Sequence, residues 1–167
     1  YEPTRLASYY DYESMEFTPE ISAALDIYAE ESTTPSTEGH ILTIYSESTR
    51  IKSILADLFN NILDVNTNLA MWIRNTAKYG DDFVYLKIDP EKGVIGCNQL
   101  PNVEIERVES GTYPNVNVDG DEKDRKIKFV WKDKGLEFNS WEIAHFRLLG
   151  DDRRLPYGTS MLEKARR

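Results

Sequence analysis

The chain has 167 residues, of which 40% are hydrophobic, and a net charge of −9 at pH 7. This length predicts one domain with a true hydrophobic core, and the acidic balance argues against tight wrapping of nucleic acid, which relies on clustered Lys and Arg. A single cysteine, Cys97, excludes an internal disulfide, and with two histidines it cannot complete a zinc site built from Cys and His alone.

The negative charge is concentrated at the start of the chain. Residues 1–47 hold ten acidic residues and one basic residue, whereas residues 48–167 hold nineteen of each. An acidic surface would let DNA slide past without sticking. It could equally serve only to keep the protein soluble, and both interpretations stay open.

Helical signals run from residue 18 to residue 79. Thr18-Pro19-Glu20 is a typical helix start, and that helix should end near Glu31, before a Thr/Ser/Pro-rich loop. A short strand is predicted over 40–45. A second helix should begin near Ser48, and its apolar stripe is expected in the core: Ile51, Ile54, Leu55, Leu58, Ile62 and Leu63.

The third helix should be capped by Asp64 or Asn66 and stopped by Tyr79-Gly80. After this helix the spacing of apolar residues changes to the two-residue period of strands. A hairpin loop is predicted over 89–93 and a long polar loop over 109–126. The fold class is therefore predicted to be α+β: N-terminal helices packed with a small antiparallel β region, ending in the start of a long helix. The predicted strands cover 83–88, 93–100, 103–108, 126–131, 136–138 and 141–148.

Residues that could carry chemistry are few. The chain has no phosphate-binding glycine loop and no serine nucleophile elbow. The paired acids Asp81-Asp82 and Asp151-Asp152 could bind a divalent metal, but adjacent acids in turns are usually solvated, so we expect no metal site and no cofactor. His145 could act as a general base, yet no nucleophile accompanies it, and a hydrogen-bonded structural histidine is favoured.

The most specific stretch is residues 141–163, which read as a strand, a charged turn, a Pro-Tyr-Gly corner and a new helix. Ser160 and Glu163 have capping-box spacing for that helix. Gly158 is expected to take a backbone angle closed to other residues. The candidate residues of this structural junction are Pro156, Tyr157, Gly158, Ser160 and Glu163.

The run "WEIAHFRLLGDDRRLPYGTSMLEKARR" resembles the portal vertex proteins of T4-like tailed phages, in which an Ile-x-His-Phe-Arg strand leads through a Pro-Tyr-Gly-x-Ser corner into a long helix. The stretches "PEISAALDIYAEEST", "RIKSILADLFNNILDVNTNLAMWIRNTAKYGD" and "QLPNVEIERVE" are similar to the same family. The resemblance covers most of the chain from about residue 12 onward. Because such portals are several times longer, we expect this chain to be a fragment, monomeric by itself.

The resemblance implies a non-enzymatic subunit of a homododecameric channel at the capsid vertex. Such a subunit would contact the terminase large subunit, the major capsid and scaffold or core proteins, the neck and tail proteins, and double-stranded DNA passing without sequence specificity. It would be found in the virion and, during head assembly, in the host cytoplasm or at the inner membrane. On this scheme residues 1–150 form a wing-type domain, its acidic part outward, and residues 151–167 a junction and the start of a stem-directed helix.

Residues 147–167 carry a local positive charge, and we hypothesise ion pairs between neighbouring subunits there. The candidates for these contacts are Arg147, Asp151, Asp152, Arg153 and Arg154. A solvated turn is the alternative reading. Two other functions stay open: a different neck or baseplate component, and a metal-dependent hydrolase using Asp81, Asp82 or Asp151 with His145.

Overall fold

A computed structural model describes residues 4–110, 126–150 and 154–166. Within these ranges its four α-helices precede its strands, so helices and strands are segregated along the chain, as is typical of an α+β fold. The helices are α1 (Arg5–Glu16), α2 (Pro19–Ser32), α3 (Thr49–Asp57), the π-helix η1 (Leu58–Ile62) and α4 (Val65–Tyr79). The strands are β1 (Asp81–Asp89), β2 (Gly93–Leu100), β3 (Ile105–Ser110), β4 (Lys126–Trp131), β5 (Leu136–Asn139) and β6 (Ile143–Arg147). Short 3₁₀ helices are η3 (Lys132–Lys134) and η5 (Glu163–Ala165).

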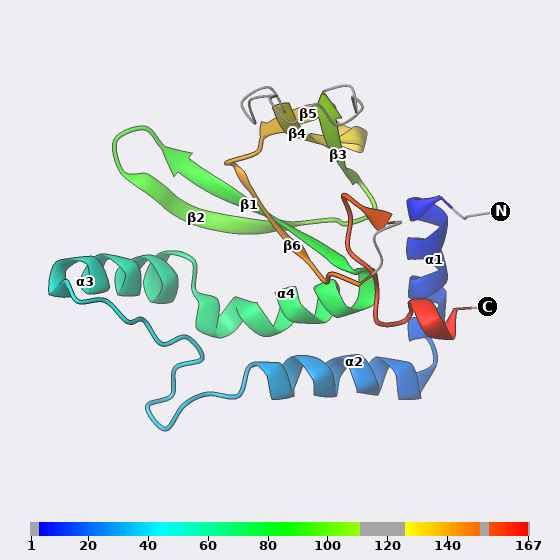
Figure 1. Ribbon diagram of the computed structural model, residues 1–167, viewed down its shortest axis with the longest axis horizontal. Helices are drawn as coiled ribbons and strands as arrows, with labels where there is room; N and C mark the ends of the chain where they lie inside the picture. Colours follow the sequence, from blue (N-terminus) through cyan, green and yellow to red (C-terminus); the bar gives the residue numbers. More distant parts are fainter. Residues whose placement is uncertain (1–3, 111–125, 151–153, 167) are drawn as a thin grey trace, which may run out of the picture.

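The strands form two antiparallel three-stranded sheets, ordered β2-β1-β6 and β3-β4-β5. Figure 1 shows α4 running beneath the first sheet, α2 beneath α4, and the second sheet above. β1 is therefore buried on both faces: Phe83 packs with Ile105 and Phe129, whereas Val84 packs with Trp72 of α4. Side chains alternate along a strand, which is how neighbouring residues enter two different core clusters.

The residues that begin α2 and α3 and end α4 are those that the sequence predicted. The hydroxyl of Ser48 accepts the N–H of Ile51 and caps α3, and Pro19 starts α2. Gly80 ends α4 with a φ of 85°, the left-handed conformation that glycine tolerates. The hairpin joining β1 to β2 was also predicted, and it is confirmed.

Two sequence expectations fail in whole or in part, and one helix was not predicted. Residues 40–45 form no strand; the N–H of Ile41 instead donates to Oδ1 of Asn66 at the start of α4. The apolar stripe predicted to begin in α3 is core only in part: Ile51 and Ile54 are 51% and 58% exposed, whereas Leu63 packs against the buried cluster around Trp72. Helix α1, which the sequence did not predict, is held by the buried Tyr9 and Tyr12.

The chain after the corner also differs from the expected α-helix. Over the residues described there, Met161 and Leu162 form a turn and η5 follows. The polar loop predicted over 109–126 falls mostly on residues 111–125, which lie outside the described ranges. None of the described helices is long and apolar enough to cross a membrane.

Candidate functional site

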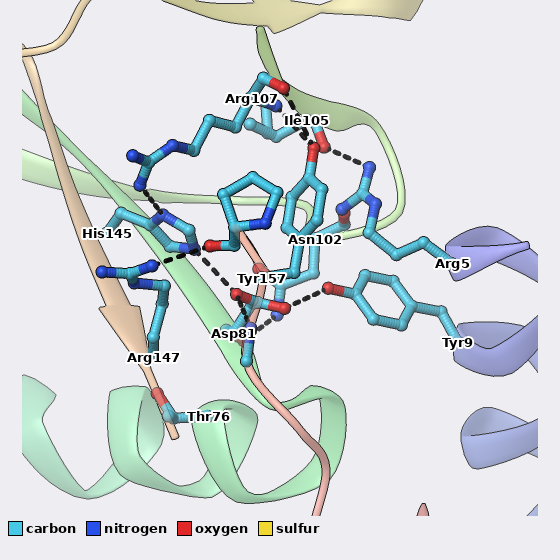
Figure 2. Close-up of polar contacts among 12 residues, drawn as sticks. Arg5, Tyr9, Thr76, Asp81, Asn102, Ile105, Arg107, His145, Arg147 and Tyr157 are labelled. Carbon is cyan, nitrogen blue, oxygen red and sulfur yellow. Dashed lines mark hydrogen bonds and ion pairs between the residues drawn. The ribbon is translucent and has the colours of Figure 1, made fainter. Parts of the chain in front are cut away.

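The best-defined polar site surrounds Asp81, the first residue of β1 (Figure 2). Its side chain is fully buried. A buried carboxylate is costly unless it is hydrogen-bonded, and this one is: Oδ2 accepts the Tyr9 hydroxyl at 2.7 Å and Oδ1 accepts the Gly158 amide at 2.9 Å. We call the following set the Asp81 junction: Arg5, Tyr9, Asp81, Arg107, His145, Tyr157 and Gly158.

His145 provides the third contact, with Nε2 2.7 Å from Oδ1 of Asp81. Its Nδ1 lies 3.4 Å from a guanidinium nitrogen of Arg107. Because a guanidinium only donates, Nδ1 must accept, and the proton is inferred to sit on Nε2, pointing at Asp81. Burial lowers the pKa of His145, Asp81 opposes this shift, and Arg107 adds to it. The imidazole is therefore a neutral donor, as expected for a structural histidine.

Helix α1 enters the junction through two side chains. Burial raises the pKa of the Tyr9 hydroxyl, and the nearby charge of Asp81 raises it further, so it remains a protonated donor. Arg5 places its guanidinium 4.4 Å from the ring centre of Tyr157 and donates to the carbonyl of Ile105 at 2.6 Å. Helix α1 is thereby joined both to β3 and to the corner, an arrangement visible in Figure 2.

The Pro-Tyr-Gly corner (residues 156–158) is held by contacts with β3 and β6. The Tyr157 hydroxyl accepts the Arg107 amide at 2.8 Å and donates to the same residue's carbonyl at 3.3 Å. Arg147 donates to the Pro156 carbonyl at 2.9 Å. The Leu155–Pro156 peptide bond is cis.

Gly158 is needed for close approach and not, as expected from the sequence, for an unusual backbone angle. It is absent from the glycines with positive φ, a group that does include Gly80. A Cβ built on Gly158 would lie 1.9 Å from the Gly80 carbonyl oxygen and 2.9 Å from the Leu148 nitrogen. The corner therefore packs directly on the backbone between α4 and β1.

The residues that follow bind α4 and α1. Ser160 donates to the Lys78 carbonyl at 2.5 Å and accepts the Leu162 amide at 2.9 Å. Glu163 does not complete the expected capping box, because its carboxylate binds Tyr12, Arg154 and Arg166. The capping-box spacing therefore did not predict the contacts that these two residues form.

Asp81 and Asp82 were expected to be solvated turn residues, and that expectation is wrong: both are fully buried. They point to opposite sides of β1, as neighbours on a strand must. The Gln99 amide donates to both carboxylate oxygens of Asp82, at 2.9 and 3.0 Å. Two carboxylates on opposite faces cannot share one metal ion, and the described residues contain no group of three or more potential metal ligands.

Of the candidate inter-subunit residues, Arg147 and Arg154 lie within the described ranges. Asp151, Asp152 and Arg153 lie outside the described residues. Arg154 pairs with Glu163 of the same chain at 2.6 Å. Sequence reasoning missed Arg5, Tyr9 and Arg107 altogether, since nothing local marks a residue as the partner of a distant aspartate.

Cys97 on β2 is half-buried, and burial raises the pKa of its thiol. The Asp81 junction itself offers donors that are already satisfied and no nucleophile beside His145. Its geometry is that of a structural lock joining α1, β1, β3, β6 and the corner.

The family model described as "Bacteriophage T4-like portal protein (Gp20)" matches residues 5–148. The match includes all of α1, whereas the sequence resemblance began at about residue 12, and it stops before the corner. No curated protein matches this chain.

Proposed function

This chain belongs to the family of bacteriophage T4-like portal proteins, and we propose that it is a subunit of the dodecameric ring through which DNA enters and leaves the capsid. The observation that carries the proposal is the family match over residues 5–148, which includes every helix from α1 to α4 and every strand. Portal proteins are structural proteins of the capsid vertex, so the chain's place is in the virion.

The structure supports a mechanical role for the Asp81 junction within such a subunit. We infer that residues 1–150 form the wing-type domain and that residues 151–167 lead from it toward the stem. The corner would then transmit force between the two parts while DNA is packaged. A satisfied buried network resists such force, because each donor that loses Asp81 would be left unpaired in a low-dielectric interior.

The partners follow from the same proposal: the terminase large subunit during packaging, the major capsid and scaffold or core proteins during head assembly, and neck and tail proteins afterwards. Assembly would take place in the host cytoplasm, at the inner membrane in some phages. The acidic surface of residues 1–47 would face outward from the ring. DNA would pass through the channel without sequence-specific contacts.

Contacts between neighbouring subunits are proposed for the charged turn that follows β6. Asp151, Asp152 and Arg153 remain candidates for them together with Arg147. Arg154 would take part only by exchanging Glu163 for a neighbour's carboxylate, because the two are paired within the chain.

Electron microscopy of the protein expressed from its complete gene tests the proposal. Dodecameric rings with a central hole are the expected result. A monomer, or an assembly without a hole, would refute the portal assignment and favour another phage structural component. Charge reversal at Arg153 and Arg154 in the same protein tests the turn separately, since unchanged ring formation would remove it from the interface.

A further inference from the structure

Helix α3 exposes an apolar stripe that the rest of the chain leaves uncovered. Ile51 and Ile54 are more than half exposed, and no residue of this helix is fully buried. Among the described elements, α3 packs substantially only on the adjoining η1. In Figure 1 it lies at one end of the molecule, opposite α1 and the C-terminus. Exposed apolar side chains that share one helix face are typical of an interaction surface.

Two cations flank this stripe. Arg50 and Lys52 are the immediate neighbours of Ile51, so on a helix they stand on either side of it. Both are exposed, and neither forms an ion pair within the part of the chain that the structure describes. The α3 face is thus an apolar strip with a positive rim.

The outward face of α2 has the complementary character. Leu25 and Ala29 of α2 are buried, and the opposite side of the helix exposes Ala23, Ala24 and Ile27, the last at 59%. Three exposed acids surround these small and apolar residues, and none of the ion pairs among the described residues uses them. These acids are Glu20, Glu30 and Glu31.

We propose that α3 of one copy packs on the outward face of α2 in a second copy. Ile51 and Ile54 would cover Ala23, Ala24 and Ile27, while Arg50 and Lys52 would meet the acids around them. Small alanines let two helices approach closely, and opposite charges at the rim fix the register. The faces differ, so the contact is head-to-tail, and repeated contacts of this kind close into a ring when the rotation between copies divides a full turn. The proposal rests on the proposed function, since it names a surface through which portal subunits would meet.

Disulfide trapping between two single-cysteine chains tests the contact, with Cys97→Ser in both. One 167-residue chain carries Ile54→Cys and the other carries Ile27→Cys and an affinity tag, so only contacts between copies are captured. The matched control pairs Ile54→Cys with Leu136→Cys, an exposed position on β5. We expect the first pair to give more than about fivefold the mixed-disulfide yield of the control, because several rim ion pairs and the apolar strip act together.

Charge reversal makes the test specific to these helices. Arg50→Glu with Lys52→Glu in the Ile54→Cys chain should reduce the yield to the control level, and Glu20→Lys, Glu30→Lys and Glu31→Lys in the other chain should restore it. All these positions are exposed, and unchanged circular dichroism melting would show that the variants fold. A yield equal to that of the control pair, or one insensitive to charge reversal, overturns the proposal.

Failure of this contact and failure of the portal assignment give different results. Rings of the complete gene product that persist with Arg50→Glu and Lys52→Glu would refute the α3–α2 contact and leave the portal assignment intact. The absence of rings in the unaltered protein would refute the portal assignment, whatever the trapping yield.

Discussion

Nε2 of His145 lies 2.7 Å from Oδ1 of Asp81, and the two side chains are 6% and 0% exposed. In the sheet, His145 of β6 is the register partner of Phe83 of β1, and its side chain reaches back to Asp81. The pair thus connects β6 to β1. The same Oδ1 atom accepts the Gly158 amide. One carboxylate oxygen therefore fixes both the last strand of the sheet and the corner that follows it.

Replacement of Asp81 should be among the most destabilising changes in the chain. Asp81→Ala leaves the Tyr9 hydroxyl, the Gly158 amide and the His145 N–H without their acceptor, which should cost about 3–5 kcal/mol of unfolding free energy. Asp81→Asn keeps one acceptor and should cost less. Urea unfolding measures both. Asp133→Asn, at an exposed position, is the control, and a comparable loss there would show that Asp81 has no special role.

Gly158→Ala should displace the corner or destabilise the fold. Its Cβ would lie 1.9 Å from the Gly80 carbonyl oxygen, and backbone on both sides leaves little room for relaxation. We expect a loss of about 3 kcal/mol, the upper range for overpacking. Gly96→Ala is the matched control, because its Cβ would meet only the flexible Lys87 side chain at 3.8 Å. Equal melting temperatures for the two variants would contradict the close packing of Gly158.

Asp82 should make stability depend on pH in an unusual direction for a carboxyl group. Burial raises the pKa of Asp82 to about 7, although hydrogen bonds, above all the one from Gln99, lower it in part. In the unfolded chain the pKa of an aspartate is about 3.9. The folded state thus holds a proton that the unfolded chain has lost. This contribution to stability is fully present below about pH 4 and is lost as the pH rises through about 7.

Asp82→Asn removes that titration. The variant should gain stability relative to the unaltered protein between pH 4 and pH 8, by up to about 4 kcal/mol. His145 titrates in both proteins, so its opposite contribution cancels in the difference. Urea unfolding across this pH range measures the effect, and two parallel stability curves would contradict the raised pKa.

Tyr157→Phe removes a hydroxyl that binds both backbone groups of Arg107. We expect a loss of about 1–2 kcal/mol, since the Arg107 amide would lose its acceptor in a half-buried site. Tyr45→Phe serves as the control because Tyr45 is 89% exposed. Thermal unfolding compares the two, and identical melting temperatures would mean that the hydroxyl contributes nothing.

Much of the fold could be predicted because its signals are local. Thr18 and Pro19 mark the start of α2, Ser48 caps α3, and Gly80 ends α4. The strand predicted over 40–45 failed because apolar composition alone does not supply a strand to pair with; Asn66 satisfies Ile41 instead. Local sequence patterns therefore predicted helices and strands, but not the segments with which they pair.

The Asp81 junction could not be predicted for the same reason. Its partners Tyr9, His145 and Gly158 lie 72, 64 and 77 residues away in the sequence. An Asp-Asp pair after a helix-ending glycine has the composition of a solvated turn, and only tertiary packing makes it buried. The corner was recognised from its residue types, whereas the role of Gly158 depends on the backbone of Gly80, which no local rule reveals.

Hydrogen exchange at the Gly158 amide tests most directly the claim that a buried aspartate locks the corner to the sheet. The amide donates to Oδ1 of Asp81 inside the fold, so nuclear magnetic resonance should find it among the slowly exchanging amides of the chain. Asp81→Ala should remove that protection. Amides in the middle of α2 should keep the protection that the global stability of the variant allows. Rapid exchange of the Gly158 amide in the unaltered protein would contradict the lock.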